Sequence, residues 1–484
     1  MRPASQAETR ALPTANPEAL ARVARATAYK YDVLPLTIRD GTLTIAVPED
    51  AGAELLDYLR GTTRLKIAPL RVHRERIRER VRASYGDSAA SGALQGHVVD
   101  APAVRAVDDI FERAIRAHAS DVHVEPTADG GLVRVRIDGI LRELRTIDSA
   151  LYPALVSRIK LIAGMDIADK RQPQDGRSTI GYEQRDIDAR VSSVPTIDGE
   201  KLVIRLLDQH AQSPDLARLG MPTGLLAAYR AMLGSPWGFI VVAGPTGSGK
   251  TTTLYGSLAA LDATSRHVCS VEDPVEMRVS GVSQVQINPR AGVTFATVLR
   301  CFMRQDPNVI MVGEMRDAET AAVAVSASLA GQLVFTTLHA NDAPRSVERL
   351  VELGVARHSL AAGITAVIAQ RLVRRLCEIC RNQEAIPANV RARHAFPHDR
   401  WYAAAGCRSC DGTGYIGRTG LYELLVVDDP LRDAIAGGAS SVQIAQLGKA
   451  SGYRPMLADG LEKVLAGETS FAELTRVVAG AALA

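Results

Sequence analysis

In the second half of the chain, short apolar runs alternate with longer segments of helical pattern. Four runs are long enough to form buried strands: 237–243, 268–271, 309–312 and 333–338. The first run is followed by residues 251–261, which have the pattern of a helix. Strands that alternate with helices are typical of a parallel sheet covered on both faces. We therefore predict an α/β domain over residues 223–484.

The first 85 residues have the pattern of a small mixed domain. Residues 38–47 predict a hairpin with its turn at Asp40–Gly41, and a helix is expected near 53–60. Residues 71–82 hold six arginines and two glutamates. They predict a solvated helix in which Glu75–Arg78 and Glu79–Arg82 are neighbours. Attraction to an acidic partner or an anionic lipid is the alternative.

Two segments with linker composition divide the rest of the chain, at 86–104 and 209–222. Between them we expect a helix at 106–119 and strands at 121–125, 131–137 and 202–207. The predicted division is therefore a loose N-terminus (1–16), an N-terminal domain (17–85), a linker (86–104), a middle α+β domain (105–208), a linker (209–222) and the α/β domain (223–484).

Composition and charge narrow the classes of function. The 484 residues are 46% hydrophobic, 23% charged and 4% aromatic, with a net charge of +3. This balance argues against nucleic-acid binding through bulk charge or base stacking, so no nucleic-acid partner is expected. Residues 1–20 lack the apolar core of a signal peptide, and the uncharged segment 321–338 is better explained as a buried helix, a turn and a strand. We expect a cytoplasmic protein with peripheral membrane contact.

A phosphate-binding loop follows the first buried run of the α/β domain. The segment 244–251 matches G-x-x-x-x-G-K-[ST] at every fixed position. Its glycines allow backbone N–H groups to surround a phosphate, Lys250 adds a positive charge, and Thr251 is the expected Mg²⁺ ligand. The expected nucleotide contacts are Gly244, Pro245, Thr246, Gly247, Ser248, Gly249, Lys250, Thr251 and Thr252.

Three further strands end in polar side chains that belong at the same edge of the sheet. Glu272 ends one strand, Glu314 follows another, and His339 follows a third. Gly313 stands where a nucleotide-hydrolysing strand usually has its first acid. Mg²⁺ must then depend on Thr251, phosphate and water, which leaves Glu314 to polarise the attacking water. His339 is expected near a γ-phosphate, with a structural role as the alternative.

The six cysteines are unevenly placed. Cys377, Cys380, Cys407 and Cys410 form two C-x-x-C pairs, which predict a structural Zn²⁺ site with four thiolate ligands. A redox pair or a reduced remnant of such a site is the alternative. Cys269 and Cys301 are isolated, and we expect both to be small core residues.

Taken together, the motifs resemble those of the secretion ATPases, the hexameric motors of type II secretion, type IV pilus and conjugation systems. The resemblance covers about residue 104 to the C-terminus. It rests on GPTGSGKTTTLY (244–255), SVEDPVE (270–276), RQDPNVIMVGEMRDAETA (304–321), TTLHANDA (336–343), the middle-domain segments ASDVHVEP (119–126), RVRIDG (134–139) and QPQDGR (172–177), and the cysteine segment 407–423.

This resemblance implies an α/β fold with a RecA-like P-loop motor domain, a preceding PAS-like α+β domain, a small N-terminal domain and a zinc-binding subdomain at about 375–415. It also implies arginines that approach the phosphates, some of them from the preceding domain. By motif position these are Arg190, Arg205, Arg300 and Arg304. Each of them is otherwise explained as a member of a surface ion pair.

Within the family, the cysteine module resembles that of assembly motors and is generally absent from retraction motors. The resemblance therefore implies a homo-hexameric ATP hydrolase of type II secretion that uses ATP, Mg²⁺ and Zn²⁺. It would act at the inner membrane, with the N-terminal domain docked on platform proteins and acidic phospholipid as a further possible contact. The alternatives are a type IV pilus extension ATPase, a DNA-uptake or conjugation ATPase, and a non-hydrolysing nucleotide-gated scaffold.

Overall fold

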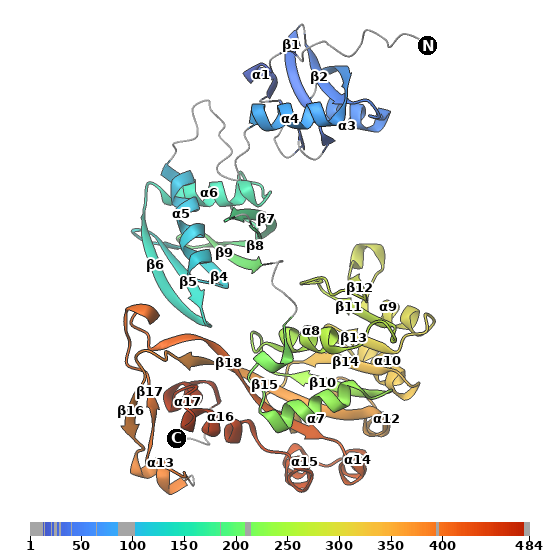
Figure 1. Ribbon diagram of the computed structural model, residues 1–484, viewed down its shortest axis with the longest axis vertical. Coiled ribbons are helices and arrows are strands. Elements are labelled where there is room, and N and C mark those ends of the chain that lie inside the picture. Colours follow the sequence, from blue (N-terminus) through green and yellow to red (C-terminus); the bar gives the residue numbers. More distant parts are fainter. Residues whose placement is uncertain are drawn as a thin grey trace, which may run out of the picture. The chain divides into compact units, whose positions relative to one another are not determined.

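A computed structural model describes residues 13, 15–20, 22–23, 27–28, 31–39, 41–63, 65–85, 102–183, 185–208, 214–393 and 396–478 (Figure 1). Two compact units divide the chain: residues 1–135 with 143–207, and residues 136–142 with 208–484. Most of the predicted linker 86–104, part of the linker 209–222 and most of the predicted loose N-terminus lie outside the described residues. Within the described residues, no helix is long and apolar enough to cross a membrane.

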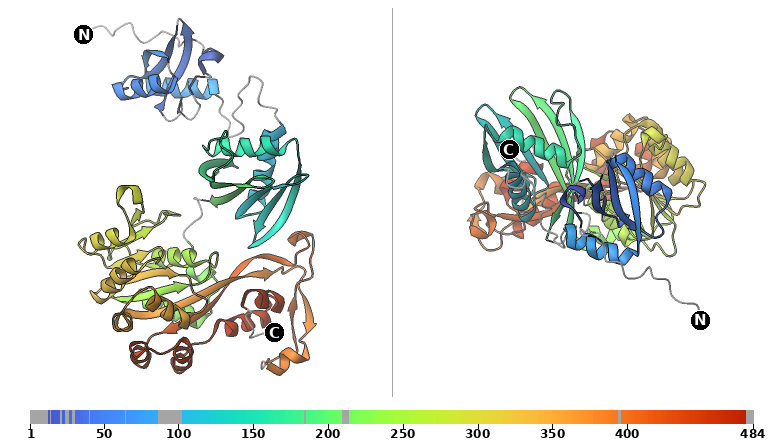
Figure 2. Two further views of the ribbon diagram at one scale, coloured as in Figure 1. Left: turned by 180° about the vertical axis from the view of Figure 1, so that it is seen from behind. Right: turned by 90° about the horizontal axis from the view of Figure 1, so that it is seen from above.

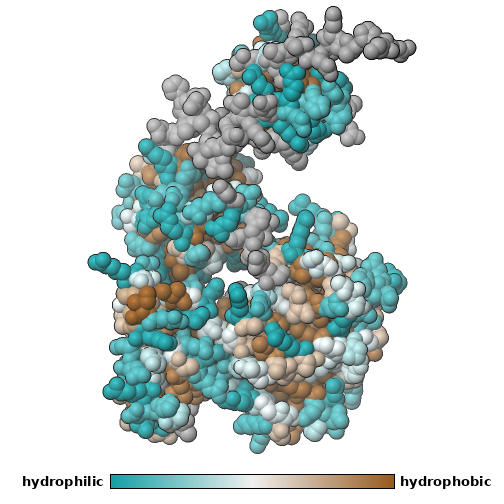
Figure 3. Space-filling view, in the orientation of Figure 1, coloured by the Kyte–Doolittle hydropathy of each residue, from teal (hydrophilic) through white to brown (hydrophobic). Residues whose placement is uncertain are grey.

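The N-terminal domain is a small sheet with helices. Its elements are α1 (Pro17–Leu20), β1 (Leu34–Arg39), β2 (Thr42–Pro48), α3 (Ala53–Thr63), β3 (Lys66–Val72) and α4 (Arg74–Tyr85). The sheet order is β1-β2-β3, with β1 and β2 antiparallel and β2 and β3 parallel. The predicted hairpin is confirmed, although Asp40 lies outside the described residues. Hydrophilic side chains cover much of the visible face of this domain (Figure 3).

The arginine-rich segment differs from the prediction. Arg71 belongs to β3, and its guanidinium donates to the backbone carbonyls of Glu49 and Ala51. In α4, Arg74 and Arg78 both contact the carboxylate of Asp32, at 3.0 and 2.8 Å. The segment is therefore a strand followed by a helix, and three of its six arginines hold the domain together.

The middle domain is a six-stranded sheet with two helices. Its elements are α5 (Pro102–Arg116), β4 (Asp121–Thr127), β5 (Gly130–Ile137), β6 (Ile140–Asp148), α6 (Tyr152–Ile162), β7 (Gln174–Tyr182), β8 (Arg185–Thr196) and β9 (Gly199–Asp208). The strand order is β6-β5-β4-β9-β8-β7. The predicted helix and strands are confirmed, whereas β6, β7 and β8 were not predicted. Burial alternates along β7 and through the middle of β8, so one face of the sheet carries the core and the other is more open.

The α/β domain is built on a seven-stranded sheet. Its first elements are η1 (Leu216–Arg218), α7 (Thr223–Leu233), β10 (Gly238–Ala243), α8 (Lys250–Ala260), β11 (Val268–Glu272), β12 (Val282–Gln286), η2 (Pro289–Ala291) and α9 (Phe295–Phe302). They are followed by β13 (Val309–Val312), α10 (Ala318–Leu329), β14 (Leu333–Leu338), α11 (Ala343–Glu352), α12 (Arg357–Gly363), β15 (Ile364–Leu376) and β18 (Tyr415–Val426). The strand order is β12-β11-β13-β14-β10-β15-β18.

Two hydrophobic cores cover the two faces of this sheet. Alternate residues of β10 divide between them: Phe239 and Val241 pack with α9 to α12, and Ile240 and Val242 pack with α7 and α8. The predicted doubly covered sheet is confirmed, and its strands are parallel up to β15 (Figure 2). The edge strand β18 departs from the prediction, because it pairs antiparallel with β15.

The cysteine subdomain lies between β15 and β18 and packs beside the C-terminal helices. Its elements are β16 (Asn382–Ala385), α13 (Ala388–Arg393), β17 (Arg400–Ala403) and η3 (Arg408–Cys410). The C-terminal helices are α14 (Asp429–Ala436), α15 (Ser441–Gly448), η4 (Lys449–Ser451), α16 (Met456–Leu465) and α17 (Phe471–Val478). The rings of Trp401 and Phe471 stack at 4.5 Å and join β17 to α17.

The two isolated cysteines differ in environment. Cys269 is buried in β11, as predicted. Cys301 is exposed, so its prediction as a core residue is wrong. It lies on α9 but is not among the buried residues of that helix, which include Val298, Leu299 and Phe302.

Candidate active site

The loop between β10 and α8 has a backbone that favours glycine at several positions. Gly247 and Gly249 have φ values of 76° and 88°. A Cβ added at Gly244 would lie 2.4 Å from Ser248 Oγ and 2.5 Å from the carbonyl oxygen of Gln370. The glycines therefore allow a tight loop that ends at the N-terminus of α8, where helices attract anions.

Gln370 of β15 braces this loop. Its Nε2 donates to the carbonyl oxygen of Ser248 at 2.8 Å, and its Oε1 accepts from the hydroxyl of Thr253 at 2.7 Å. Gln370 is 1% exposed, so both bonds are shielded from water. The side chain thus joins the loop to the first turn of α8. No motif in the sequence indicated it.

The residues of the loop fit a phosphate group. The ammonium of Lys250 donates to the carbonyl oxygens of Gly244 and Pro245, at 2.8 and 2.9 Å. Burial lowers the pKa of Lys250, and the negative charge of Glu314 opposes that shift. Ser248 Oγ is buried and has no hydrogen-bond partner among the described residues. The buried Ser248 hydroxyl can donate a hydrogen bond, and the buried Lys250 ammonium lies at a helix N-terminus. Both groups would stabilise a bound anion.

A cavity of about 200 Å³ brings together four of the residues predicted as catalytic: Lys250, Glu272, Glu314 and His339. The loop contributes Thr246, Gly247, Lys250 and Thr251 to its wall, and the strand ends contribute Glu272, Glu314 and His339. The common edge predicted for the strand ends is thus confirmed. Gly313 also lines the cavity, and a Cβ there would approach Glu272 Cα to 3.3 Å. A side chain at this position would therefore be tightly packed against the end of β11.

Glu272 is the most enclosed of the acidic side chains in the wall. It is 3% exposed and accepts hydrogen bonds from the hydroxyls of Tyr255 and Ser270 and from Gln284 Nε2. Burial and the bond to Glu272 raise the pKa of Tyr255, which keeps its proton. The network holds the end of β11 in place. The catalytic role of Glu272 remains a prediction.

Glu314 and His339 face the cavity beside positive charges. Burial lowers the pKa of His339, and the charge of Lys250 lowers it further. His339 is therefore neutral at physiological pH and can accept or donate a hydrogen bond without adding charge. Glu314 forms an ion pair with Arg316, which also contacts Asp273 at 3.3 Å. Sequence reasoning missed Arg316, although it lies two residues from Glu314.

The four arginines implied by the resemblance are not part of this cavity wall. Arg300 pairs with Glu319 at 2.8 Å, and Arg304 donates to the carbonyl oxygen of Arg300. Arg190 and Arg205 belong to the other unit of the chain, on the neighbouring strands β8 and β9. Arg205 contacts Asp121 at 3.3 Å. Their roles at the phosphates remain predictions.

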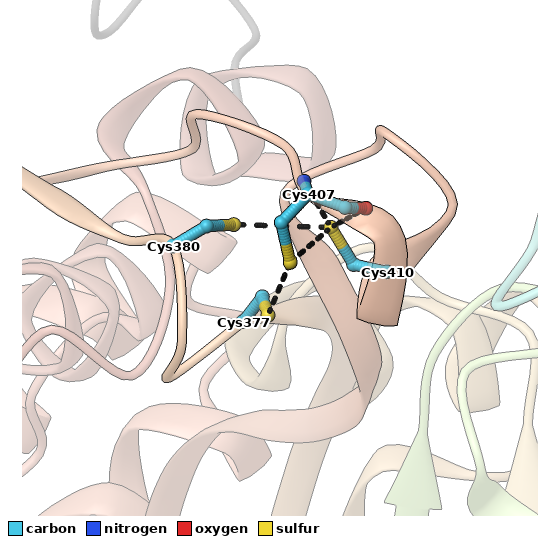
Figure 4. Close-up of side chains that lie close together, drawn as sticks. All are labelled: Cys377, Cys380, Cys407 and Cys410. Atoms are coloured by element: carbon cyan, nitrogen blue, oxygen red, sulfur yellow. Dashed lines mark hydrogen bonds between the residues drawn. The ribbon is translucent and has the colours of Figure 1, made fainter.

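The four cysteines of the two pairs converge at one point (Figure 4). Their sulfur atoms lie within 4.8 Å of one another, with Cys377–Cys407, Cys380–Cys410 and Cys407–Cys410 separations of 3.9, 3.8 and 3.7 Å. Four sulfurs at Zn–S distances of about 2.3 Å in a tetrahedron are about 3.8 Å apart. The donor set therefore fits Zn²⁺.

Backbone N–H groups also point at these sulfurs. Cys407 N and Gly414 N both donate to Cys410 Sγ at 3.1 Å, and Gly406 N donates to Cys380 Sγ at 3.3 Å. Burial opposes ionisation of Cys410, but the hydrogen bonds from Cys407 N and Gly414 N and the neighbouring thiols lower its pKa to about 6, whereas burial and the neighbouring thiols raise the pKa of Cys380 to about 11. Thiolates are the form that binds metal.

A glycine-rich loop between a central parallel strand and a helix, with Lys250 and Thr251 at the helix start, defines a P-loop nucleotide-binding protein. Comparison with family models identifies the family of P-loop proteins to which the chain belongs. Residues 97–476 match the model for type II/IV secretion system proteins, and residues 11–91 match the MshEN domain. The chain belongs to the type II/IV secretion system protein family.

Relatives in this family align over most of the chain. The type II secretion system protein HxcR of Pseudomonas aeruginosa is 47% identical over 78% of this chain and 77% of its own length. The type IV pilus assembly ATPase PilB of Myxococcus xanthus is 36% identical over 95% of this chain and 86% of its own length. The solved ATPase DotB of Legionella pneumophila has a TM-score of 0.58 at 20% identity, covering 79% of this chain and 97% of that one, and shows a similar fold.

Proposed function

We propose that this chain is a Mg²⁺-dependent ATP hydrolase that powers protein export by a type II secretion system. The observation that carries the proposal is the cavity in which Lys250, Thr251 and Glu314 meet at the phosphate-binding loop. The relatives support it, because several are named as type II secretion proteins and one of these as a type II secretion ATPase.

Each residue of the site has a distinct task in this proposal. Lys250 and the loop N–H groups bind the phosphates, and the Thr251 hydroxyl holds Mg²⁺, which neutralises phosphate charge when bound. Glu314 orients the attacking water and accepts its proton. Gln370 and the Glu272 network keep the loop and the end of β11 in position.

Two substitutions separate binding from hydrolysis. Lys250→Ala removes the buried cation, so both ATP affinity and turnover should fall. Glu314→Gln keeps the loop intact, so ATP should still bind while turnover drops by about 10²–10⁴-fold. Arg349→Ala, on the exposed face of α11, is the matched control and should behave as wild type. Phosphate release and fluorescent-nucleotide binding measure the two effects; unchanged turnover in Glu314→Gln would remove it as the base.

A second proposal concerns the metal. We propose that Cys377, Cys380, Cys407 and Cys410 hold one structural Zn²⁺ per chain. The sulfur separations and the N–H groups directed at the sulfurs support this. Zinc would tie the end of β15 to the start of β18 and keep the subdomain folded against α17.

The partners belong to the same proposal. We infer a homo-hexamer at the cytoplasmic face of the inner membrane, with the N-terminal domain docked on platform proteins. An acidic phospholipid contact would have to use arginines other than Arg71, Arg74 and Arg78, which are engaged within the domain. A type IV pilus extension ATPase is the second candidate. It is favoured by the Myxococcus xanthus PilB alignment, which covers 95% of this chain.

A further inference from the structure

Thr337 is a buried polar residue at the end of an apolar row on β14. Leu333 and Phe335 of this strand pack in the core beside α7 and α8, and Thr337 is the next residue on the same face. Thr337 is 4% exposed and lines the cavity beside the phosphate-binding loop. Valine would fill a similar volume without a polar atom, so packing alone does not account for a hydroxyl at this position.

Thr337 holds the backbone on both sides of Glu314. Its hydroxyl donates to the carbonyl oxygen of Gly313, the residue before Glu314, at 2.7 Å. Met315 N, on the residue after Glu314, donates to the carbonyl oxygen of Thr337 at 3.3 Å. Gly313 N also donates to the carbonyl oxygen of Val271 at 2.8 Å. The backbone at the end of β13 is therefore held from β14 on one side and from β11 on the other.

The regular pairing of β13 ends before it reaches Glu314. Its last paired residue is Val312, which lies opposite Thr336 on β14 and Val271 on β11. Beyond Val312 the chain leaves the strand toward α10, so the strand ladder no longer fixes the direction of the Glu314 side chain. The hydroxyl of Thr337 extends the connection to β14 by one residue. The Glu314 side chain is 22% exposed at the cavity wall, so its direction depends on this backbone.

We propose that Thr337 is a positioning residue for Glu314. Its hydroxyl fixes the peptide group between residues 313 and 314, and thereby the direction in which the proton-accepting carboxylate leaves the backbone. A general base must lie within hydrogen-bond reach of the water that it activates, and a misplacement of about 1 Å can cost about 10²-fold in rate. Because His339 lies two residues beyond Thr337, the same bond also fixes the spacing of Glu314 and His339. This inference rests on the proposed ATPase function.

The test separates the hydroxyl of Thr337 from its volume, in the full-length protein. Thr337→Val keeps the volume and removes the donor. Its kcat for ATP should fall about 10–100-fold, while KM and the affinity for a fluorescent ATP analogue stay within about twofold. Thr337→Ser keeps the donor and should retain most of the wild-type kcat. Equal losses in the valine and serine variants would show that the hydroxyl is not the cause and would overturn the inference.

Thr469→Val is the matched control for an effect of stability alone. The Thr469 side chain is fully buried, and its hydroxyl donates to the carbonyl oxygen of Arg374 at 2.8 Å. This variant loses the same kind of hydrogen bond at a place outside the cavity wall. Its unfolding temperature should fall about as much as that of Thr337→Val, while its kcat stays at the wild-type value. A similar loss of kcat in Thr469→Val would overturn the inference, because the rate would then follow stability.

Combination with Glu314→Gln tests whether Thr337 acts through Glu314. If it does, adding Thr337→Val to Glu314→Gln should leave the residual rate unchanged. A further loss in the double variant, a fall in nucleotide affinity, or a wild-type kcat in Thr337→Val would overturn the inference. Should Thr337→Val fail to fold, Thr337→Ala also lacks the hydroxyl and decides by the same comparison with Thr337→Ser.

Failure of the proposed function has a different signature. It would appear as a wild-type protein without ATPase activity, or as unchanged rates in both Lys250→Ala and Glu314→Gln. Failure of the present inference leaves those two results intact and changes only the Thr337 series.

Discussion

Gln370 shows how one side chain from a distant strand determines the shape of the nucleotide loop. It lies 122 residues from Ser248 and 117 residues from Thr253, and it is hydrogen-bonded to both. Its backbone carbonyl also lies where a Cβ on Gly244 would clash. The loop is therefore shaped by its own glycines and by β15 together.

We predict that Gln370→Leu weakens both the fold of the loop and nucleotide binding. The change removes the donor to the buried Ser248 carbonyl and the acceptor for the buried Thr253 hydroxyl. A buried polar group that loses its partner costs about 1–3 kcal/mol. Thermal unfolding and fluorescent-nucleotide titration measure the two effects. Thr253→Val removes only one of the bonds, so its effect should be smaller in both measurements. A Gln370→Leu protein with wild-type affinity would show that the brace is dispensable.

The site residues that could be predicted from the sequence are those that belong to short motifs or that directly follow a recognisable strand. Lys250 and Thr251 follow from an eight-residue pattern, and the strand ends at Glu272, Glu314 and His339 follow from the rule that parallel strands share an edge. Gln370 acts through contacts between separate strands, and a single sequence carries no signal for such pairs. Arg316 is close in sequence to Glu314, but nothing in spacing distinguished it from a surface arginine.

At the level of elements, β15 and β18 explain both the antiparallel edge and the place of the cysteine subdomain. The two strands pair from Ala366–Val426 to Leu376–Tyr415, and the subdomain is inserted where they end. The return strand β18 is antiparallel because the chain turns back through this insertion. The alternation of strands and helices in the sequence predicted parallel strands. It did not indicate that β18 would run antiparallel to β15.

For the cysteine subdomain, we predict that loss of one ligand loosens the subdomain but not the nucleotide cavity. Cys407→Ser removes one of four zinc ligands, and structural zinc contributes folding free energy directly. Elemental analysis should show one zinc per chain in wild type and a reduced content in the variant. The fluorescence of Trp401, which packs on Phe471, should change while nucleotide affinity is retained. Zinc-free wild-type protein purified without chelator would contradict the site.

Helix α17 is attached to β15 by a buried carboxylate. Glu473 is 1% exposed, and it accepts from Arg374 N at 3.1 Å, from Arg374 Nη2 at 2.7 Å and from Arg476. Burial alone would raise the pKa of Glu473, but the hydrogen bonds from Arg476 and Arg374 lower it to about 2. The ionised form is thus favoured by folding.

This lowered pKa predicts a loss of stability in acid. A group with a depressed pKa in the folded state stabilises the protein above its unfolded pKa, near 4.5, and the contribution disappears as pH falls toward about 2. The shift corresponds to about 3 kcal/mol. Denaturant unfolding followed by Trp401 fluorescence, with Trp237 replaced by Phe, should show Glu473→Gln less stable than its parent above pH 5. The difference should narrow as pH falls; a constant difference would exclude this linkage.

At the scale of the whole molecule, the two predicted arginines of the middle domain share one face of its sheet. On β8, Ile187, Ala189 and Val191 are buried, so Arg190 belongs to the opposite, more open face. On β9, Leu202 and Ile204 are buried, which places Arg205 on the open face too. Arg177 is the cross-strand neighbour of Arg190 on β7. The open face therefore carries Arg177, Arg190 and Arg205 together with carboxylates, among them Asp188 on β8 and Asp121, which pairs with Arg205.

The last prediction connects this face to oligomerisation. Phosphoryl transfer spreads negative charge over three oxygens, and an arginine placed there can contribute about 10³–10⁵ in rate. The resemblance assigns this task to Arg190 and Arg205, and a ring of subunits provides a way to bring a middle domain to a motor domain. Arg190→Ala and Arg205→Ala should then lower turnover strongly, with fold, zinc content and nucleotide affinity retained. Arg113→Ala, on α5 of the same domain, is the control and should keep wild-type turnover.

Activity per chain should rise with protein concentration as rings form, in step with the mass measured by light scattering. A rate per chain that is the same for monomer and oligomer would contradict a ring-dependent mechanism, and wild-type rates in both arginine variants would exclude their role at the phosphates.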